Sequence, residues 1–181
     1  MLTYQKTILL TLLFLLTIFA VGCGGATARP APTNDGLFEF KSPDGLFSLR
    51  VPETWTESTV KSTDGKLMQF KFTAPDQRGF IHIVTATGDK PVSNPVAQAF
   101  MLRILQSYVD KDDKINILSD NETSKNQHTL IWHATKNFFG GKVIVDNRGN
   151  NLIVVGASGL DSASAAYRDL IDRVLASYQA H

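Results

Sequence analysis

Apolar and polar side chains alternate along most of residues 37–159, and this period of two is typical of β-strands that bury one face. The strands expected from it cover residues 37–41, 46–51, 57–62, 67–73, 80–87, 114–119, 129–136, 142–145 and 152–156. Ser42-Pro43-Asp44-Gly45 and Thr63-Asp64-Gly65-Lys66 are turn sequences, so they predict hairpins. A polar connection is expected at residues 120–126 and a tight polar turn at residues 146–151. Residues 80–87 are apolar on both faces, which predicts a strand in the middle of a sheet with layers on both sides.

Two other segments have apolar residues at helical spacing. The first is expected to begin at Asn94 as its N-cap, with Pro95 in the first turn, and to end near Asp110. The second, Ser162–Tyr178, has a continuous apolar stripe opposite charged residues, so it should lie on the face of a sheet. This order of strands and helices predicts an α+β domain over residues 37–181, with an antiparallel sheet on which helices pack.

The first 36 residues have a different character. An almost unbroken apolar run, Ile8–Ala20, follows Lys6 and is followed by small residues up to Cys23, the only cysteine. This pattern indicates a secretory leader over residues 1–22. The segment Ala20-Val21-Gly22-Cys23 resembles the bacterial lipoprotein box. The resemblance implies that the chain is cut before Cys23 and that this cysteine carries the lipid.

Two alternatives to a lipid anchor remain. The apolar stretch Thr7–Gly22 could be an uncleaved anchor helix, although it is shorter than the roughly 20 residues that span a bilayer. An ordinary secretory leader would leave Cys23 as a free thiol. Residues 23–36 are rich in Gly, Pro and Thr and are expected to form a flexible tether. We expect the protein on the extracytoplasmic face of a cell membrane or an outer membrane.

Net charge argues against one class of partner, and cysteine content excludes one kind of crosslink. The formal net charge is +1, and Lys6 is the only charged residue of the expected leader, so the remaining chain is neutral. A neutral domain has no general attraction to nucleic acid, and no nucleic-acid partner is expected. A single cysteine cannot form an internal disulfide, so packing must stabilise the fold.

Three histidines of the domain are candidates for binding or catalysis. His82 lies on the expected central strand, whereas His128 and His133 lie on or beside a later one. These two are an odd number of residues apart, so they should point to opposite faces and cannot share a metal ion without a bulge. A hydrogen-bonded histidine without further function is the alternative for each.

Asp110, Asp112 and Asp113 form an acidic cluster that could attract a hard cation. The cluster lacks the glycine and the distal glutamate of a calcium loop, and adjacent lysines compensate its charge, so a solvated loop is the alternative. Trp55 and Trp132 are expected in the core or as its lid, with a ligand platform as the alternative. The candidate residues for a ligand- or partner-binding face are His82, Asp110, Asp112, Asp113 and Trp55.

No motif for catalysis occurs in the sequence. Ser158 in Gly156-Ala157-Ser158-Gly159 lacks the Gly-x-Ser-x-Gly spacing of a nucleophile elbow. The chain has no phosphate-binding loop and no Cys/His metal spacing. We therefore expect neither an enzyme nor a bound cofactor.

The segment Phe38–Trp55, F-E-F-K-S-P-D-G-L-F-S-L-R-V-P-E-T-W, resembles the opening of the PsbP-like family. There a strand, a short turn, a second strand, a proline and a tryptophan follow in this order. The resemblance extends in outline over residues 37–179 and implies an α/β/α sandwich around a central antiparallel sheet. The family includes extrinsic proteins of photosystem II and bacterial lipoproteins, and it has no shared catalytic motif.

These observations lead to two functional hypotheses. The first is a non-enzymatic, lipid-anchored domain that binds or assists a membrane-protein complex or an envelope component, with a photosystem as partner only in a photosynthetic organism. The second is a lipoprotein that binds a small ligand or a metal ion. Both attach the protein to the membrane through Cys23.

Overall fold

The computed structural model describes residues 35–136, 139–159 and 165–181. The predicted leader, Cys23 and all but the last two residues of the predicted tether lie outside them. The elements in chain order are β1 (Leu37–Lys41), β2 (Phe47–Pro52), β3 (Thr56–Lys61), β4 (Leu67–Thr73), β5 (Gly79–Thr87), α2 (Asn94–Gln106), β6 (Ile115–Ser124), β7 (Gln127–Ala134), β8 (Gly140–Arg148), β9 (Asn151–Gly159), α3 (Ala165–Ala176) and β10 (Gln179–Ala180).

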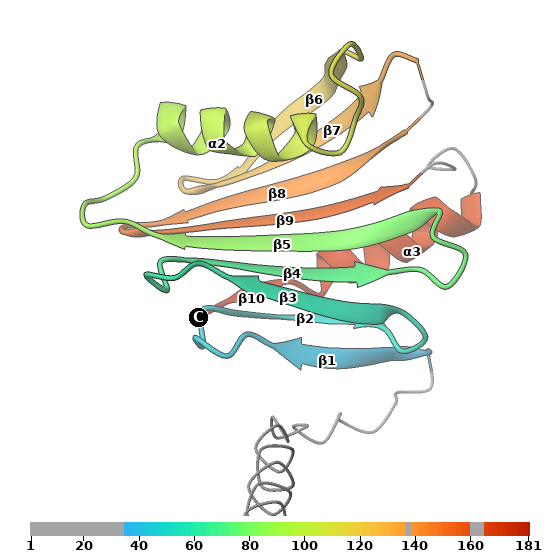
Figure 1. Cartoon of the computed structure of the whole chain (residues 1–181), viewed down its shortest axis with the longest axis horizontal. Coiled ribbons are helices and arrows are strands. Elements are labelled where there is room, and N and C mark those ends of the chain that lie inside the picture. The colour runs from blue at the N-terminus through green and yellow to red at the C-terminus, as the bar shows by residue number, and fades with distance from the viewer. Residues whose placement is uncertain (1–34, 137–138, 160–164) are drawn as a thin grey trace, which may run out of the picture. The chain divides into compact units, whose positions relative to one another are not determined.

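The strands form two antiparallel sheets rather than the single sheet expected from the sequence. The larger sheet has seven strands in the order β3-β4-β5-β9-β8-β7-β6 (Figure 1). The predicted first hairpin, β1–β2, is present but belongs to a separate sheet of order β1-β2-β10. Strand β2 is buried along almost its whole length, because it lies between β1 and β10 in the small sheet and shares an apolar cluster with the larger sheet and α3. The prediction that residues 80–87 form an interior strand is confirmed by β5.

One face of the larger sheet packs on both the small sheet and α3. Phe70, Phe72 and Ile83 on this face share a buried cluster with Phe47 of β2 and Val174 of α3. The predicted apolar stripe of the last helix is confirmed for α3, whose charged residues point to solvent. The helix ends at Ala176 rather than at Tyr178, and residues 162–164 of the predicted span lie outside the described residues. Figure 1 shows α3 behind the sheet and α2 in front of it.

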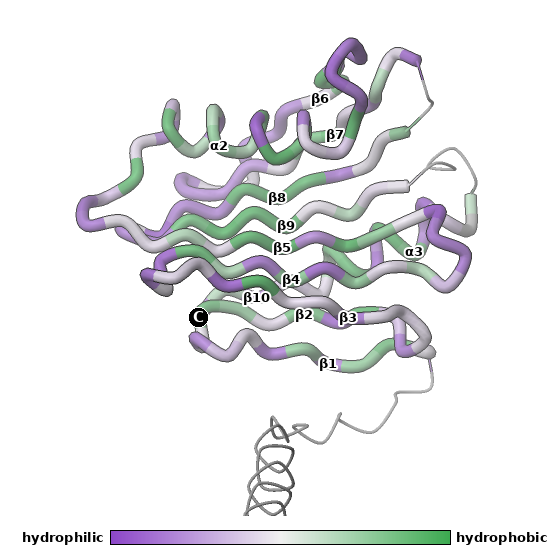
Figure 2. Tube along the Cα trace, viewed as in Figure 1, coloured by the Kyte–Doolittle hydropathy of each residue, from purple (hydrophilic) through white to green (hydrophobic). Residues whose placement is uncertain are grey.

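The opposite face is covered by α2 over only part of its width. Ala97, Met101 and Leu105 of α2 pack on a second buried cluster that includes Trp132 and Val143. Hydrophobic stretches run through the middle of β8, β9 and β5, whereas hydrophilic residues gather at the turns (Figure 2). The sheet therefore has apolar cores on both faces, and α2 leaves the side of β3 and β4 open.

Several element boundaries differ from the prediction. Ser93, not Asn94, is the N-cap of α2, and the helix ends at Gln106, before the predicted end at Asp110. The Ser107 hydroxyl donates to the Ile104 carbonyl at 2.6 Å and closes the last turn, after which Tyr108 turns toward the sheet.

The polar connections at residues 120–126 and 146–151 are shorter than predicted. Strand β6 continues to Ser124, and β8 continues to Arg148. Strand β6 is an edge strand that pairs only with β7, so its second half needs few apolar side chains. Residues 120–124 and 146–148 were therefore expected in connections because they are polar, although they belong to strands.

Candidate functional site

His82 is the centre of a polar network at the end of α2. Its Nδ1 lies 2.6 Å from the Tyr108 hydroxyl, and its Nε2 lies 3.1 Å from Oε1 of Gln69. An amide oxygen only accepts, so Nε2 carries the imidazole proton and Nδ1 accepts from the phenol. The network joins β4, β5 and the residue two positions after α2, and it holds the end of the helix on the sheet.

Burial makes this network neutral. Burial and, to a smaller extent, the nearby positive charge of Lys71 lower the pKa of His82 from 6.5 to about 4. Burial also raises the pKa of the Tyr108 phenol, which therefore remains a donor. A neutral imidazole with a pKa this far below 7 is a weak general base at neutral pH. The candidate residue His82 therefore suits a structural role, or contact with a ligand, better than proton transfer.

The three aspartates of the acidic cluster do not converge. Asp113 is buried, and its Oδ1 accepts hydrogen bonds from Thr135 Oγ1 at 2.7 Å and from the backbone N–H groups of residues 114, 135 and 136. These hydrogen bonds, with that from Thr135 first, lower the pKa of the Asp113 carboxyl. Asp112 forms an ion pair with Lys136, and Asp110 lies at the edge of a hollow beside Tyr108. The three carboxylates therefore do not act as one cluster, and Asp113 is not solvated, because it fixes the start of β6 to the end of β7.

Trp55 is a core residue and not part of a surface. Only 7% of it is exposed, and it belongs to the cluster between the two sheets. Trp132 is also buried, on the opposite face. The expectation of two core tryptophans is confirmed, and Trp55 is removed from the candidate binding face.

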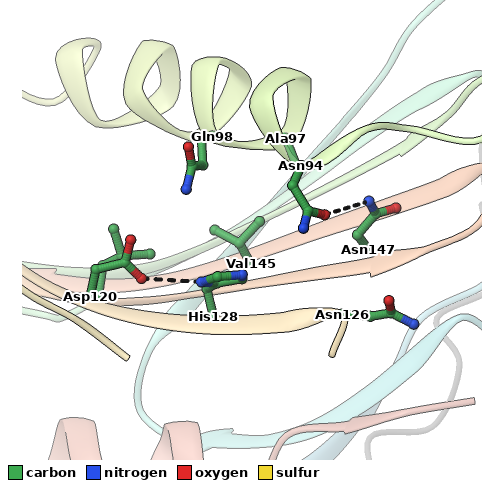
Figure 3. Close-up of a pocket in the computed structure, with 9 residues that line it drawn as sticks. Asn94, Ala97, Gln98, Asp120, Asn126, His128, Val145 and Asn147 are labelled. Atoms are coloured by element: carbon green, nitrogen blue, oxygen red, sulfur yellow. Dashed lines mark hydrogen bonds and ion pairs between the residues drawn. The ribbon is translucent and has the colours of Figure 1, made fainter. Parts of the chain in front are cut away.

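A small polar pocket lies between the start of α2 and the sheet (Figure 3). His128 points to it, with its Nδ1 3.2 Å from Asp120 Oδ1. The Asn147 amide donates to Val92 O at 2.5 Å and to Asn94 Oδ1 at 3.4 Å. Its volume is about 10 Å³, which is room for about one water molecule. His133 lines a different groove, beside Lys142 and Ile171, so the two histidines lie on opposite faces as predicted.

Sequence reasoning missed Asp146, which it placed in a turn. This carboxylate is only 1% exposed. It accepts hydrogen bonds from Arg148 Nε at 2.9 Å and from the Tyr178 hydroxyl at 3.1 Å. It thereby ties the C-terminal segment to β8. An aspartate followed two residues later by an arginine on one strand face is the signal that could have indicated an ion pair.

Among the described residues, no three His, Cys, Asp or Glu side chains lie close enough together to hold a metal ion. Within the same residues, neither α2 nor α3 has the length and hydropathy of a membrane-crossing helix.

The architecture is similar to that of a solved structure, the cyanobacterial PsbP protein CyanoP from Synechocystis sp. PCC 6803. The likeness has a TM-score of 0.61 at 14% sequence identity and covers 88% of this chain and 98% of CyanoP. The domain has a PsbP-like fold. A crystal structure from Bacteroides thetaiotaomicron VPI-5482 is similar over 79% of this chain and 48% of its own, at 17% identity and a TM-score of 0.43. No family model and no curated protein matches the sequence.

The PsbP-like resemblance seen in residues 38–55 is thus confirmed at the level of the fold. At 14% identity the likeness extends to the fold and not to any individual site residue.

Proposed function

We propose that the protein is a lipid-anchored accessory domain on the extracytoplasmic face of a cell membrane or an outer membrane. It binds or assists a membrane-protein complex or an envelope component and performs no catalysis. The observation that carries this proposal is the likeness to CyanoP over nearly the whole of that protein. The candidate lipid attachment point is Cys23, which follows the leader-like segment and precedes the tether.

The site geometry supports a binding role more than a chemical one. The best-placed histidine, His82, has a pKa of about 4 and is enclosed by Tyr108 and Gln69. The acidic cluster is divided between a structural role for Asp113 and an ion pair for Asp112. Neither group provides a nucleophile with an adjacent base, the arrangement that covalent catalysis requires.

The anchor is tested by fractionation. The wild-type protein should sediment with membranes and be released by detergent, and Cys23→Ala should either appear in the soluble fraction or keep its leader. A Cys23→Ala protein that stays in membranes with an unchanged mature mass would show that Cys23 carries no lipid.

The partner is tested separately by crosslinking in native membranes, followed by affinity purification of the tagged wild-type protein. A defined partner at constant stoichiometry is the expected result. Recovery of the monomer alone, under conditions that capture a known membrane complex in the same sample, would contradict the docking function.

A further inference from the structure

A hollow of about 350 Å³ opens between the β4–β5 hairpin and the chain that follows α2. This volume is within the lower part of the range of small-molecule sites. The hollow lies on the face of the larger sheet that carries α2, at the end of the sheet where β5 begins. Its lining includes Lys71, Gln77, Phe80, Tyr108, Asp110 and Phe139.

The floor of the hollow is aromatic and held in place. Phe80 contacts Tyr108 edge to face with ring centroids 4.8 Å apart, and Phe139 lies 5.6 Å from Phe80. Trp132 supports the floor from the core, at 5.8 Å from Phe139. Because the His82 hydrogen bond fixes Tyr108, the aromatic floor is held in place and offers apolar surface to a ligand.

A buried hydroxyl lies directly beside this floor. Ser158 is the cross-strand partner of Phe80 and is fully buried, and its Oγ has no hydrogen-bond partner. Because this hydroxyl is fully buried and does not line the hollow, it belongs to the core beneath the floor and is not available to a ligand.

The rim carries charges of both signs. Lys71 is exposed, and its Nζ lies 4.5 Å from the centroid of the Phe80 ring, directly above the floor. Asp110 is exposed on the other side of the hollow, after α2. A cation and a carboxylate above one aromatic surface complement a small zwitterion that has an apolar side chain.

The rim also contains an unusual backbone conformation. Gln77 has a φ of 59°, and it is the only non-glycine residue with positive φ in the described part of the chain. Glutamine is disfavoured in this left-handed region, where turns normally use Gly or Asn. Strained residues of this kind concentrate at binding sites, and here the strained residue lines the hollow.

We propose that this hollow binds a free α-amino acid with an aromatic side chain. The ligand's ring takes the place of the Lys71 ammonium over Phe80 and packs beside Tyr108. The displaced Lys71 Nζ pairs with the ligand's carboxylate, and the ligand's ammonium group faces Asp110. The site is independent of lipid attachment and partner docking, so it adds to the proposed function and does not depend on it.

The test is equilibrium dialysis of radiolabelled L-phenylalanine against the full chain reconstituted in lipid vesicles, with empty vesicles as background. Binding should be saturable, and Lys71→Gln should weaken it at least about tenfold. The matched control is Lys61→Gln, an exposed lysine on the adjacent strand β3, which should bind as the wild type does.

Two analogues of phenylalanine measure separately how much its ammonium group and its carboxylate contribute to binding. Phenylpropionate lacks the ammonium group and phenethylamine lacks the carboxylate, so both should compete more weakly than phenylalanine. Asp110→Asn should weaken phenylalanine but not phenylpropionate. No saturable binding up to about 10 mM, or equal binding by the Lys71 and Lys61 variants, would overturn the proposal.

Discussion

The buried neutral state of His82 predicts that the folded protein loses stability in mild acid. In the unfolded chain this imidazole takes up a proton near its ordinary pKa of 6.5, whereas in the folded chain it does so only near pH 4. Between these values the unfolded state binds more protons, so the contribution of His82 to the free energy of unfolding falls as the pH falls from 6.5 to 4 and is constant below pH 4. The full difference corresponds to about 3 kcal/mol, at about 1.4 kcal/mol per pKa unit.

Between pH 7 and pH 5 the same linkage amounts to about 2 kcal/mol. Urea unfolding of the wild type at both values measures the total change, which includes the other titrating groups. His82→Gln removes the imidazole and keeps a polar side chain, so its decrease over this pH range should be smaller than that of the wild type by about 2 kcal/mol. Titration of the His82 ring protons by NMR provides the folded-state pKa directly.

Tyr108→Phe tests whether the hydrogen bond from the phenol contributes to the low pKa of His82. Burial is the largest cause of this low pKa and the charge of Lys71 is the second, so the hydrogen bond is not required for it. The Tyr108→Phe protein should therefore be less stable at every pH but should retain the wild-type pH dependence. If His82→Gln shows the same pH dependence as the wild type, or if the NMR titration of His82 has its midpoint near 6.5, the description of His82 as a buried neutral group is wrong.

Three further predictions concern stability, each measured by urea unfolding at pH 7. Gln77→Gly should raise the free energy of unfolding by about 1 kcal/mol, because glycine adopts the positive φ without strain; a loss would show that the Gln77 side chain makes a stabilising contact. Gly159→Ala should lower the free energy of unfolding by at least about 2 kcal/mol, because the added methyl would overlap the Tyr167 ring. The control is Gly149→Ala, where space is open but φ is 63°, and it should lower the free energy of unfolding by only about 1 kcal/mol. Asp146→Ala should cost about 2 to 4 kcal/mol by removing the acceptor of Arg148 and Tyr178, whereas the exposed Asp172→Ala should cost less than about 1 kcal/mol.

The larger sheet could be predicted because its interior strands have a clear apolar period. Strands β5 and β9 are apolar on both faces, and both are interior. The small sheet could not be predicted, because its third strand, Gln179–Ala180, has only two residues and pairs with β2 from the other end of the chain. Nothing in a two-residue segment indicates a strand, so this pairing is a property of the packed domain.

The candidate site shows the same limit. His82 could be identified from its position on an apolar strand, but its partner Tyr108 is 26 residues away and follows a helix whose end was predicted too late. Asp113 looked like a member of a solvated cluster, because its four hydrogen-bond donors come from a turn and from the end of β7, which meet only after folding. Local charge density could not distinguish a buried cap from an exposed loop.

The residues that stabilise this domain differ from those proposed to bind a ligand. The two apolar clusters lie on opposite faces of one sheet and stabilise the fold without a disulfide in the described residues. The charged and strained residues of the hollow, Lys71, Gln77 and Asp110, are exposed and lie outside both clusters. Substitutions of Lys71 and Asp110 should therefore change ligand binding at constant thermal stability, because surface charges contribute less than about 1 kcal/mol.

Phe72→Ala in the core should reduce the free energy of unfolding by about 3 to 5 kcal/mol. Since Phe72 lies on the face opposite the hollow, any effect of this substitution on ligand binding should follow only from unfolding.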